Sequence, residues 1–138
     1  MLDLEESESN IDVDDFSRIE LLAGGSLPAL FKDIYLRNNG GYTEATEVEG
    51  DDYVFSVNGF NPIKFGGLPI EKLMVEYASQ DPALERYVPF AYDDGGNSFM
   101  LCLRGEGAGA VYLLIQDGFK MERVCASFDD FINSMRIG

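Results

Sequence analysis

The sequence predicts a single α+β domain with a mainly antiparallel central sheet flanked by about four helices. Four segments carry apolar residues at helical spacing, and they lie near both ends and in the middle of the chain. Seven short runs rich in β-branched and aromatic residues lie between them. Helices set apart from a series of neighbouring strands are typical of the α+β class, whereas regular alternation of strand and helix would indicate a parallel sheet.

The four helical segments have apolar residues at positions i, i+3, i+4 and i+7, or at most of these, which places the side chains on one helix face. They cover residues 16–23, 27–34, 70–77 and 128–135. We expect these faces to pack against the sheet.

Local residues predict where these helices begin. Asp14 and Asp15 can cap the first helix, and Ser26 can cap the second, with Pro28 in a first turn where its missing N–H costs nothing. Ser127 and the acidic residue three positions later, Asp130, form a capping-box pattern at the last helix.

Glycine and asparagine predict where the first two helices end. Gly24-Gly25 follows the first helix, and Asn38-Asn39-Gly40-Gly41 follows the second. Both residue types accept the left-handed backbone conformation of a helix C-cap. The third helix is expected to begin after Pro69.

The seven strand-like runs are bounded by turn residues. They cover residues 42–48, 53–57, 60–65, 87–92, 98–103, 110–116 and 119–125. Asp93-Asp94-Gly95-Gly96-Asn97 and Asp117-Gly118 supply turn chemistry between the later runs, so successive strands should pair antiparallel.

The chain has 138 residues, and 46% of them are hydrophobic, which is enough for one core without a disulfide or metal. Cys102 and Cys125 lie in apolar, strand-like contexts and are expected to be reduced core residues. No signal-peptide pattern opens the chain, and no apolar run approaches the ~20 residues that a membrane span requires. These features predict a cytoplasmic protein.

The formal net charge of −15 argues against a nucleic-acid partner, because phosphate binding needs clustered Lys and Arg. Seven of the 25 acidic residues lie in the first fifteen positions. We therefore expect an acidic, frayed segment over residues 1–11 and a single domain over residues 12–138. A basic partner would complement this charge, although an acidic surface also simply promotes solubility.

The absence of histidine excludes Ser-His-Asp and Cys-His nucleophile activation and histidine metal sites. The acidic pairs Asp51-Asp52 and Asp93-Asp94 could act as acid and base, but both lie among Gly and Asn and are interpreted as turn residues. The glycine-rich segment 105–110 precedes a strand, whereas a dinucleotide-binding loop opens a helix. The sequence thus predicts no enzyme activity, no cofactor and no metal.

Several short motifs, in a fixed order, resemble those of the SUKH superfamily, which groups fungal cell-wall-synthesis regulators with bacterial immunity proteins that neutralise polymorphic toxins. The motifs span nearly the whole chain: Leu27-Pro28, Asn39-Gly40-Gly41, Val88-Pro89-Phe90-Ala91, Asp94-Gly95-Gly96-Asn97, Phe99 to Leu103, Gly109-Ala110-Val111-Tyr112 and Ser127-Phe128. The resemblance implies an α+β fold, direct binding of a toxin domain, and no enzymatic activity, cofactor or metal.

The motif residues also have a structural interpretation, since Gly reaches positive φ without strain and Asn and Asp bond to local backbone. Residues expected to serve the backbone are Leu27, Pro28, Asn39, Gly40, Gly41, Pro89, Asp94, Gly95, Gly96 and Asn97.

The resulting hypothesis is a non-enzymatic immunity protein that binds a basic toxin domain, such as a nuclease. The alternative is a regulator or scaffold of the cell-wall-synthesis type without a toxin partner. Tyrosines on the outer surface would be good interface anchors, although the sequence does not say which face outward. Candidate partner contacts are the acids of predicted loops and strand edges: Glu44, Glu47, Glu49, Asp51, Asp52, Asp93, Asp94 and Glu106.

Overall fold

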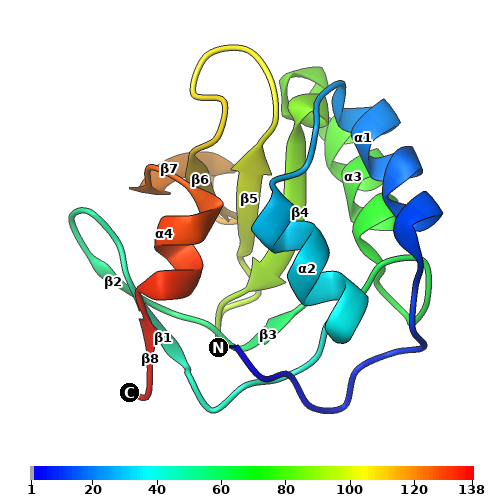
Figure 1. The fold of residues 1–138 in the computed structure, drawn as a ribbon. Helices are drawn as coiled ribbons and strands as arrows, with labels where there is room; N and C mark the ends of the chain where they lie inside the picture. The colour runs from blue at the N-terminus through cyan, green and yellow to red at the C-terminus, as the bar shows by residue number, and fades with distance from the viewer. Residues whose placement is uncertain (1) are drawn as a thin grey trace.

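A five-stranded antiparallel sheet forms the centre of the computed structural model, which describes residues 2–138 (Figure 1). Its order is β3-β4-β5-β6-β7, so β4 to β7 form a meander in which each strand pairs with its sequence neighbour. The strands are β3 (Gly59–Phe60), β4 (Tyr87–Tyr92), β5 (Ser98–Cys102), β6 (Val111–Ile115) and β7 (Lys120–Cys125).

A second, three-stranded antiparallel sheet has the order β2-β1-β8. It consists of β1 (Glu47–Glu49), β2 (Val54–Ser56) and β8 (Met135–Arg136). β1 and β2 form a hairpin, while β8 brings the C-terminal end of the chain to the other side of β1.

Four helices accompany the sheets: α1 (Ser17–Ala23), α2 (Ala29–Arg37), α3 (Ile70–Gln80) and α4 (Phe128–Asn133). Two short 3-10 helices, Val13–Phe16 and Pro82–Arg86, precede α1 and follow α3. The predicted α+β class, with a mainly antiparallel sheet and four helices, is confirmed.

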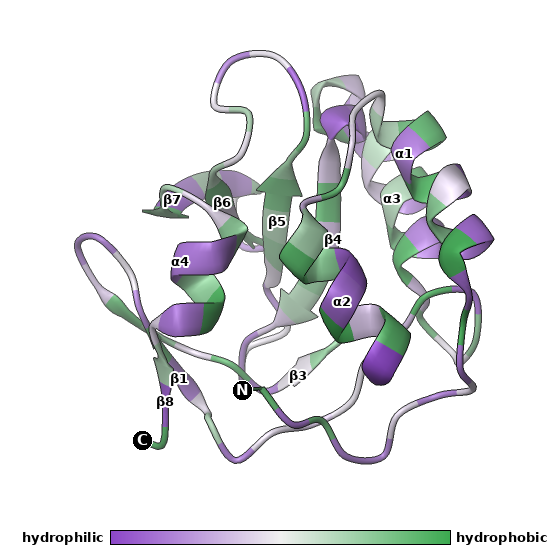
Figure 2. Cartoon of the chain, viewed as in Figure 1, coloured by the Kyte–Doolittle hydropathy of each residue, from purple (hydrophilic) through white to green (hydrophobic). Residues whose placement is uncertain are grey.

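The large sheet is buried on both faces, and β5 shows how. Phe99 and Leu101 belong to the main core, together with α2 and α4 residues such as Phe31 and Phe131. Met100 and Cys102 point to the other face and join a second cluster that includes Leu73 and Tyr77 of α3 and Leu84. Figure 2 accordingly shows hydrophobic colour along most of β5, and the helices alternate between hydrophobic and hydrophilic residues.

Two predicted helix caps differ from the structure. Asp12, and not Asp14 or Asp15, caps the first helical segment: its side chain accepts from Asp14 N–H, and the Asp15 carboxylate accepts from Asp12 N–H. The 3-10 turn before α1 moves the start of the helical segment from residue 16 to Val13. Ser26 makes no cap, because α2 begins one residue after Pro28, which occupies the N-cap position without a side-chain hydrogen bond.

The end of α1 and the start of α4 follow local chemistry more closely. Gly24 is left-handed, with φ of 71°, and ends α1. Ser127 accepts from Asp130 N–H at 3.0 Å at the start of α4, as predicted. Met135, however, lies in β8 and not in the last helix, because α4 ends at Asn133 and the chain then turns to pair with β1.

The early strands are shorter than predicted. Of the run 42–48 only residues 47 and 48 lie in β1, and of 60–65 only Phe60 lies in β3. Asn39 explains the second difference: its side chain, and not a neighbouring strand, bonds the backbone N–H and C=O of Ile63.

Residues 4–11 lie along the main body. Leu4 and Ile11 are buried, and isolated β-bridges join Glu5 to Tyr42 and Glu8 to Asn39. The boundary between residues 11 and 12 stays a prediction.

Both cysteines are buried and unbonded, as expected of reduced core residues. Among the described residues 2–138, no helix is long and apolar enough to cross a membrane.

Candidate functional site

Residues 44–56 contain strands β1 and β2 of the small sheet and the turn between them, and we call this segment the acidic hairpin. Its turn is closed by Gly50 N–H donating to Tyr53 O at 2.8 Å, and it is attached to the large sheet by Asp51 N–H donating to Val124 O at 2.7 Å. Along it lie five of the acids predicted to contact a partner: Glu44 before β1, Glu47 and Glu49 in β1, and Asp51 and Asp52 in the turn.

Asp94 extends this acidic surface from the β4–β5 loop. Its backbone N–H donates to Ser56 Oγ at 3.2 Å, and Ser56 is the β2 residue that pairs with Glu47. Asp94 is exposed, so a sixth carboxylate lies beside the base of the hairpin.

Arginines pair with part of this surface. Arg136 of β8 lies 3.3 Å from Glu47 and 3.0 Å from Glu49, and Arg123 of β7 lies 3.8 Å from Asp51. Exposed pairs of this kind contribute about 0–1 kcal/mol each, so they orient the carboxylates more than they stabilise the fold. Three acids of the surface form no ion pair with any residue in the described range: Glu44, Asp52 and Asp94.

Apolar side chains are exposed among these carboxylates. Tyr53 at the hairpin turn is 61% exposed, and Val54 beside it is 49% exposed. The ring of Tyr53 meets Phe55 edge to face at 6.3 Å between centroids, which limits its motion. An exposed aromatic ring with restricted motion, surrounded by polar groups, is typical of an interface anchor.

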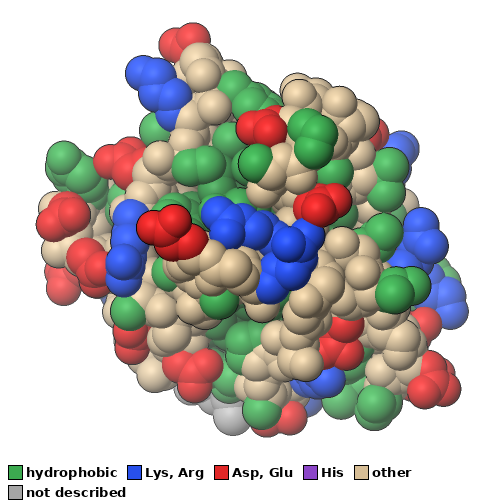
Figure 3. All heavy atoms as spheres, turned by 90° about the horizontal axis from the view of Figure 1, so that it is seen from above, with side chains coloured by type: hydrophobic (Ala, Val, Ile, Leu, Met, Phe, Trp, Pro, Cys, Tyr) green, Lys and Arg blue, Asp and Glu red, His purple; other side chains and the backbone are tan. Residues whose placement is uncertain are grey.

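Glu106 lies at the opposite end of the large sheet, in the β5–β6 loop. Arg86 donates there to the backbone oxygens of Arg104 and Glu106, and Arg104 pairs with Glu85 at 2.6 Å. Figure 3, which looks down on this end, shows basic side chains in the middle of the face with carboxylates beside them. The structure therefore does not bring Glu106 together with the acidic hairpin.

Asp93 organises the β4–β5 loop. Its carboxylate accepts from Gly95 N–H at 3.0 Å, from Asn97 N–H at 2.8 Å and from the Asn97 side-chain amide at 2.9 Å. Asn97 Oδ1 in turn accepts from Gln116 N–H at 2.9 Å, which ties this loop to the end of β6. The Asp93 carboxylate is thus held by its own loop.

The Asn39-Gly40-Gly41 motif holds its own loop against two other segments, one around Ser9 and one around Ile63. The Asn39 side chain, fully buried, donates to Ser9 O and Ile63 O and accepts from Ile63 N–H, at 2.7 to 2.9 Å. Gly40 has a positive φ, and a Cβ there would lie 2.9 Å from Phe60 O. Only glycine fits such a close approach with this backbone.

Leu27, Pro28 and Pro89 take up structural positions. Leu27 is buried, and its N–H donates to the Glu20 carboxylate at 2.7 Å, just before Pro28 at the α2 N-cap. Pro89 lies at the irregularity in the pairing of β4 with β5, where a strand tolerates a residue without an N–H.

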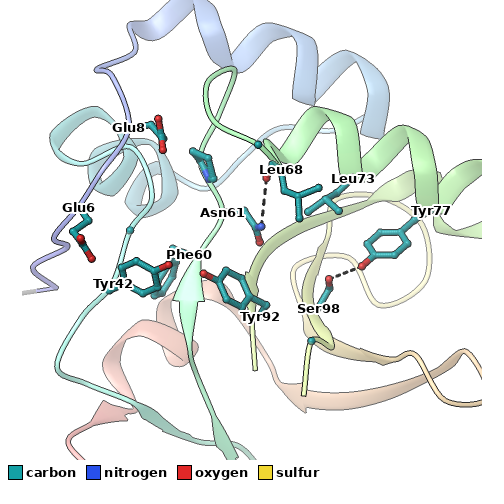
Figure 4. Close-up of a pocket in the computed structure, with 14 residues that line it drawn as sticks. Glu6, Glu8, Tyr42, Phe60, Asn61, Leu68, Leu73, Tyr77, Tyr92 and Ser98 are labelled. Carbon is teal, nitrogen blue, oxygen red and sulfur yellow. Dashed lines mark hydrogen bonds between the residues drawn. The ribbon is translucent and has the colours of Figure 1, made fainter. Parts of the chain in front are cut away.

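A cavity of about 470 Å³ lies beside the β4–β5 loop, and no pattern in the sequence predicts it (Figure 4). Both glycine motifs contribute to its wall, one through Gly41 and the other through Gly96. Side chains from the N-terminal segment, from β3, from α3 and from the β4–β5 corner complete it. They include Glu6, Glu8, Tyr42, Phe60, Asn61, Leu68, Leu73, Tyr77, Tyr92 and Ser98.

The polar groups of this cavity are unevenly satisfied. Tyr77 Oη and Ser98 Oγ are 2.7 Å apart and hydrogen-bonded. The pKa of Tyr92 is raised to about 12, mainly by burial and to a smaller extent by a hydrogen bond with Tyr42. Asn61 is 6% exposed, and its Oδ1 is buried without a hydrogen-bond partner among the residues that the structure describes. Such an orphaned acceptor costs about 1–3 kcal/mol, which a bound donor would recover.

Within residues 2–138, no group of three or more Cys, Asp or Glu side chains is placed to hold a metal ion. The arrangement provides hydrogen-bond acceptors, carboxylates and aromatic walls.

Comparison with known proteins places this arrangement in a family. No curated protein matches the sequence. The model of the SMI1 / KNR4 family (SUKH-1) matches residues 10–134, which is most of the chain and includes both glycine motifs. The predicted membership of the SUKH superfamily is thereby confirmed, and the chain belongs to the SMI1 / KNR4 (SUKH-1) family.

Proposed function

We propose that this chain is a non-enzymatic immunity protein that neutralises a basic toxin domain by direct contact. Membership of the SUKH-1 family supports a binding role. The observation that carries the proposal is the acidic hairpin: five carboxylates and an exposed tyrosine lie on one projecting element, and Asp94 lies beside its base.

The charge of this surface gives the binding mechanism. A cluster of carboxylates attracts a basic cleft over a distance of about a Debye length and raises the association rate by about 10–10³. Such a cleft is what a nuclease presents to its nucleic-acid substrate. A protein that occupies it excludes the substrate without chemistry of its own.

Short-range contact would come from the apolar tip. Tyr53 and Val54 offer exposed apolar surface next to Asp51 and Asp52. Buried aromatic anchors surrounded by polar groups contribute most of the binding free energy in typical interfaces. Charge would then set the rate of association, and Tyr53 would set the lifetime of the complex.

The test is co-expression with the product of the neighbouring gene in a host that the product harms. We expect the native chain to restore growth and to co-purify with that product. The Tyr53→Ala variant should lose both effects, since it removes the anchor while leaving the core intact. The Leu21→Ala variant is the matched control, because Leu21 is 83% exposed on α1, an element outside the hairpin.

Two outcomes would contradict the proposal. Growth that is not restored by the native chain removes the immunity role. Recovery of housekeeping proteins from the native host, with no toxin among them, favours the regulator or scaffold interpretation instead.

A further inference from the structure

The cavity beside the β4–β5 loop has the size and walls of a ligand site. Its volume of about 470 Å³ falls within the range of roughly 300–1,000 Å³ that small-molecule and side-chain pockets occupy. Tyr42, Phe60 and Tyr92 supply aromatic surface, and Leu68, which is 52% exposed, stands at the edge. A flat group carried on an aliphatic chain would match these walls.

The wall also holds an acceptor that no protein group satisfies. Asn61 Nδ2 makes a long hydrogen bond of 3.5 Å to Leu68 O, which directs Oδ1 away from that carbonyl. Figure 4 shows the Asn61 amide among the lining side chains, between Leu68 and Tyr92. A ligand for this cavity must therefore donate a hydrogen bond.

The charges at the cavity are of one sign. Of the described residues that line it, the charged ones are Glu6 and Glu8, and both are exposed. Glu8 reaches across to Gly66, where its carboxyl carbon would lie 3.2 Å from a Cβ. A cation is favoured over an anion or a neutral group at such a site.

The rim that carries these acids is fixed before any ligand arrives. Glu5 N–H donates to Tyr42 O at 2.7 Å, Ser7 Oγ donates to Gly40 O at 2.8 Å, and Glu8 N–H donates to Asn39 O at 3.1 Å. Between them Glu6 has a φ of 56°, which is uncommon for a residue other than glycine. Backbone held in such a conformation is typical of a preorganised binding site.

We propose that this cavity receives an arginine side chain of the protein partner. The guanidinium is planar, stacks on aromatic rings and has five N–H donors for the Asn61 oxygen and the carboxylates of Glu6 and Glu8. Lysine would bring the same charge and can also lie over a ring, but its compact, strongly hydrated ammonium lacks the planar group that stacks on an aromatic face and donates in several directions at once. The inference deepens the proposed function, because it names how a basic partner would be anchored.

The test uses a free probe, Nα-acetyl-arginine N-methylamide, titrated into the ¹⁵N-labelled native chain. We expect saturable millimolar binding that shifts the amide signals of Gly41, Gly67 and Gly96 and the side-chain amide of Asn61. The matched probe is Nα-acetyl-citrulline N-methylamide, which has nearly the same shape without the charge. It should bind at least about tenfold more weakly, a difference of about 1.4 kcal/mol.

Two variants locate the binding. Asn61→Leu keeps the side-chain size and removes the acceptor, so probe binding should be lost. The Glu6→Gln, Glu8→Gln double variant changes exposed residues only, so it tests the charge even if Asn61→Leu fails to fold. Its control is the Glu44→Gln, Asp52→Asn double variant, which removes the same charge from the hairpin and should bind the probe as the native chain does.

Absence of shifts at millimolar arginine probe, or equal binding of arginine and citrulline, would overturn the inference. So would a native-like response of the Glu6→Gln, Glu8→Gln variant. These outcomes are independent of the toxin, so failure of the cavity proposal is distinguishable from failure of the immunity proposal.

Discussion

At the scale of single residues, the side chains of the motifs make hydrogen bonds to backbone, and some of these bonds join segments that are distant in the sequence. Asn39 looks like part of a helix C-cap, yet its side chain bridges Ser9 and Ile63 from a fully buried position. Asp93 is interpreted from the sequence as a turn residue, and its carboxylate does close its own loop by accepting from two backbone N–H groups of that loop. Ser9 and Ile63, the hydrogen-bond partners of Asn39, are both far from it in the sequence, so no local pattern could predict these bonds.

The first prediction concerns Asn39. Replacement by Ala leaves the Ile63 N–H and the carbonyls of Ile63 and Ser9 without partners in a buried site. Such losses destabilise by about 2–4 kcal/mol, so urea unfolding should show a clear fall in the free energy of unfolding. The neighbouring Asn38→Ala variant, which removes no side-chain hydrogen bond of the described structure, should stay within about 0.5 kcal/mol of the native chain. Equal effects would contradict the account.

The second prediction concerns Cys125. Burial is the main cause that raises the pKa of its thiol to about 11, against an ordinary value of 9. The reactive thiolate at pH 8 is therefore about 100-fold scarcer than in the unfolded chain. Alkylation by iodoacetamide, followed at Cys125 by peptide mapping, should be at least that much slower in native buffer than in urea. Similar rates in the two conditions would show that the thiol is accessible.

The raised pKa also fixes the direction of a pH effect. A raised folded-state pKa favours the neutral thiol, so its contribution to stability is full below about pH 9 and is lost as the pH rises toward 11. The free energy of unfolding of the native chain should therefore decline over that range more steeply than that of a Cys125→Ala variant.

At the scale of elements, the sequence predicts those parts that local chemistry determines. All four helices and the β4–β7 meander were predicted, because helical spacing, glycine ends and Asp-Gly turns act within a few residues. β8 was missed, since a two-residue strand forms only because β1 is there to pair with it. The cavity was missed for the same reason: its walls come from segments as distant as Glu6 and Ser98.

The third prediction compares two motif glycines. Gly41 has a φ of 118°, and a Cβ there would collide with the backbone oxygen of Glu5 in the bridging N-terminal segment. Gly96 has a φ of 82°, but a Cβ there would meet no atom within 4 Å. Gly41→Ala should therefore cost about 3–5 kcal/mol and Gly96→Ala only about 1–2 kcal/mol in the free energy of unfolding.

Proteolysis would separate the two causes of this difference. If the collision displaces the N-terminal segment, residues 2–9 should be cleaved faster in Gly41→Ala than in Gly96→Ala. Equal cleavage with equal stability would mean that only backbone strain matters at both sites.

At the scale of the whole molecule, the position of the acids matters more than their number. The net charge of −15 is shared by many carboxylates, but their surroundings differ. Asp94 lies beside the base of the acidic hairpin, whose turn is bonded to the edge strand β7 at Val124, whereas Glu106 lies in the β5–β6 loop beside Arg86 and Arg104. A partner guided by local potential would approach the hairpin.

The fourth prediction tests this with the toxin partner recovered by co-expression. Charges on exposed groups are screened over about 10 Å at 0.1 M salt, so the association rate constant should fall at least about tenfold between low salt and several-fold higher ionic strength. Removing charge from the hairpin with Glu44→Gln and Asp52→Asn should slow association at low salt. Arg136→Gln frees Glu47 and Glu49 from their ion pairs and should accelerate it. Stopped-flow fluorescence measures each rate.

Glu106→Gln is the control for position, because it removes one charge from the β5–β6 loop, outside the hairpin, and should leave the rate close to that of the native chain. If it slows association as much per charge as the hairpin variant does, net charge and not the acidic hairpin guides the partner. If Arg136→Gln slows association as well, the ion pairs hold the hairpin in its binding shape, and the carboxylates act through their orientation. We expect Arg136→Gln to raise the association rate constant and Glu106→Gln to leave it unchanged. This result requires a local electrostatic field centred on residues 44–56.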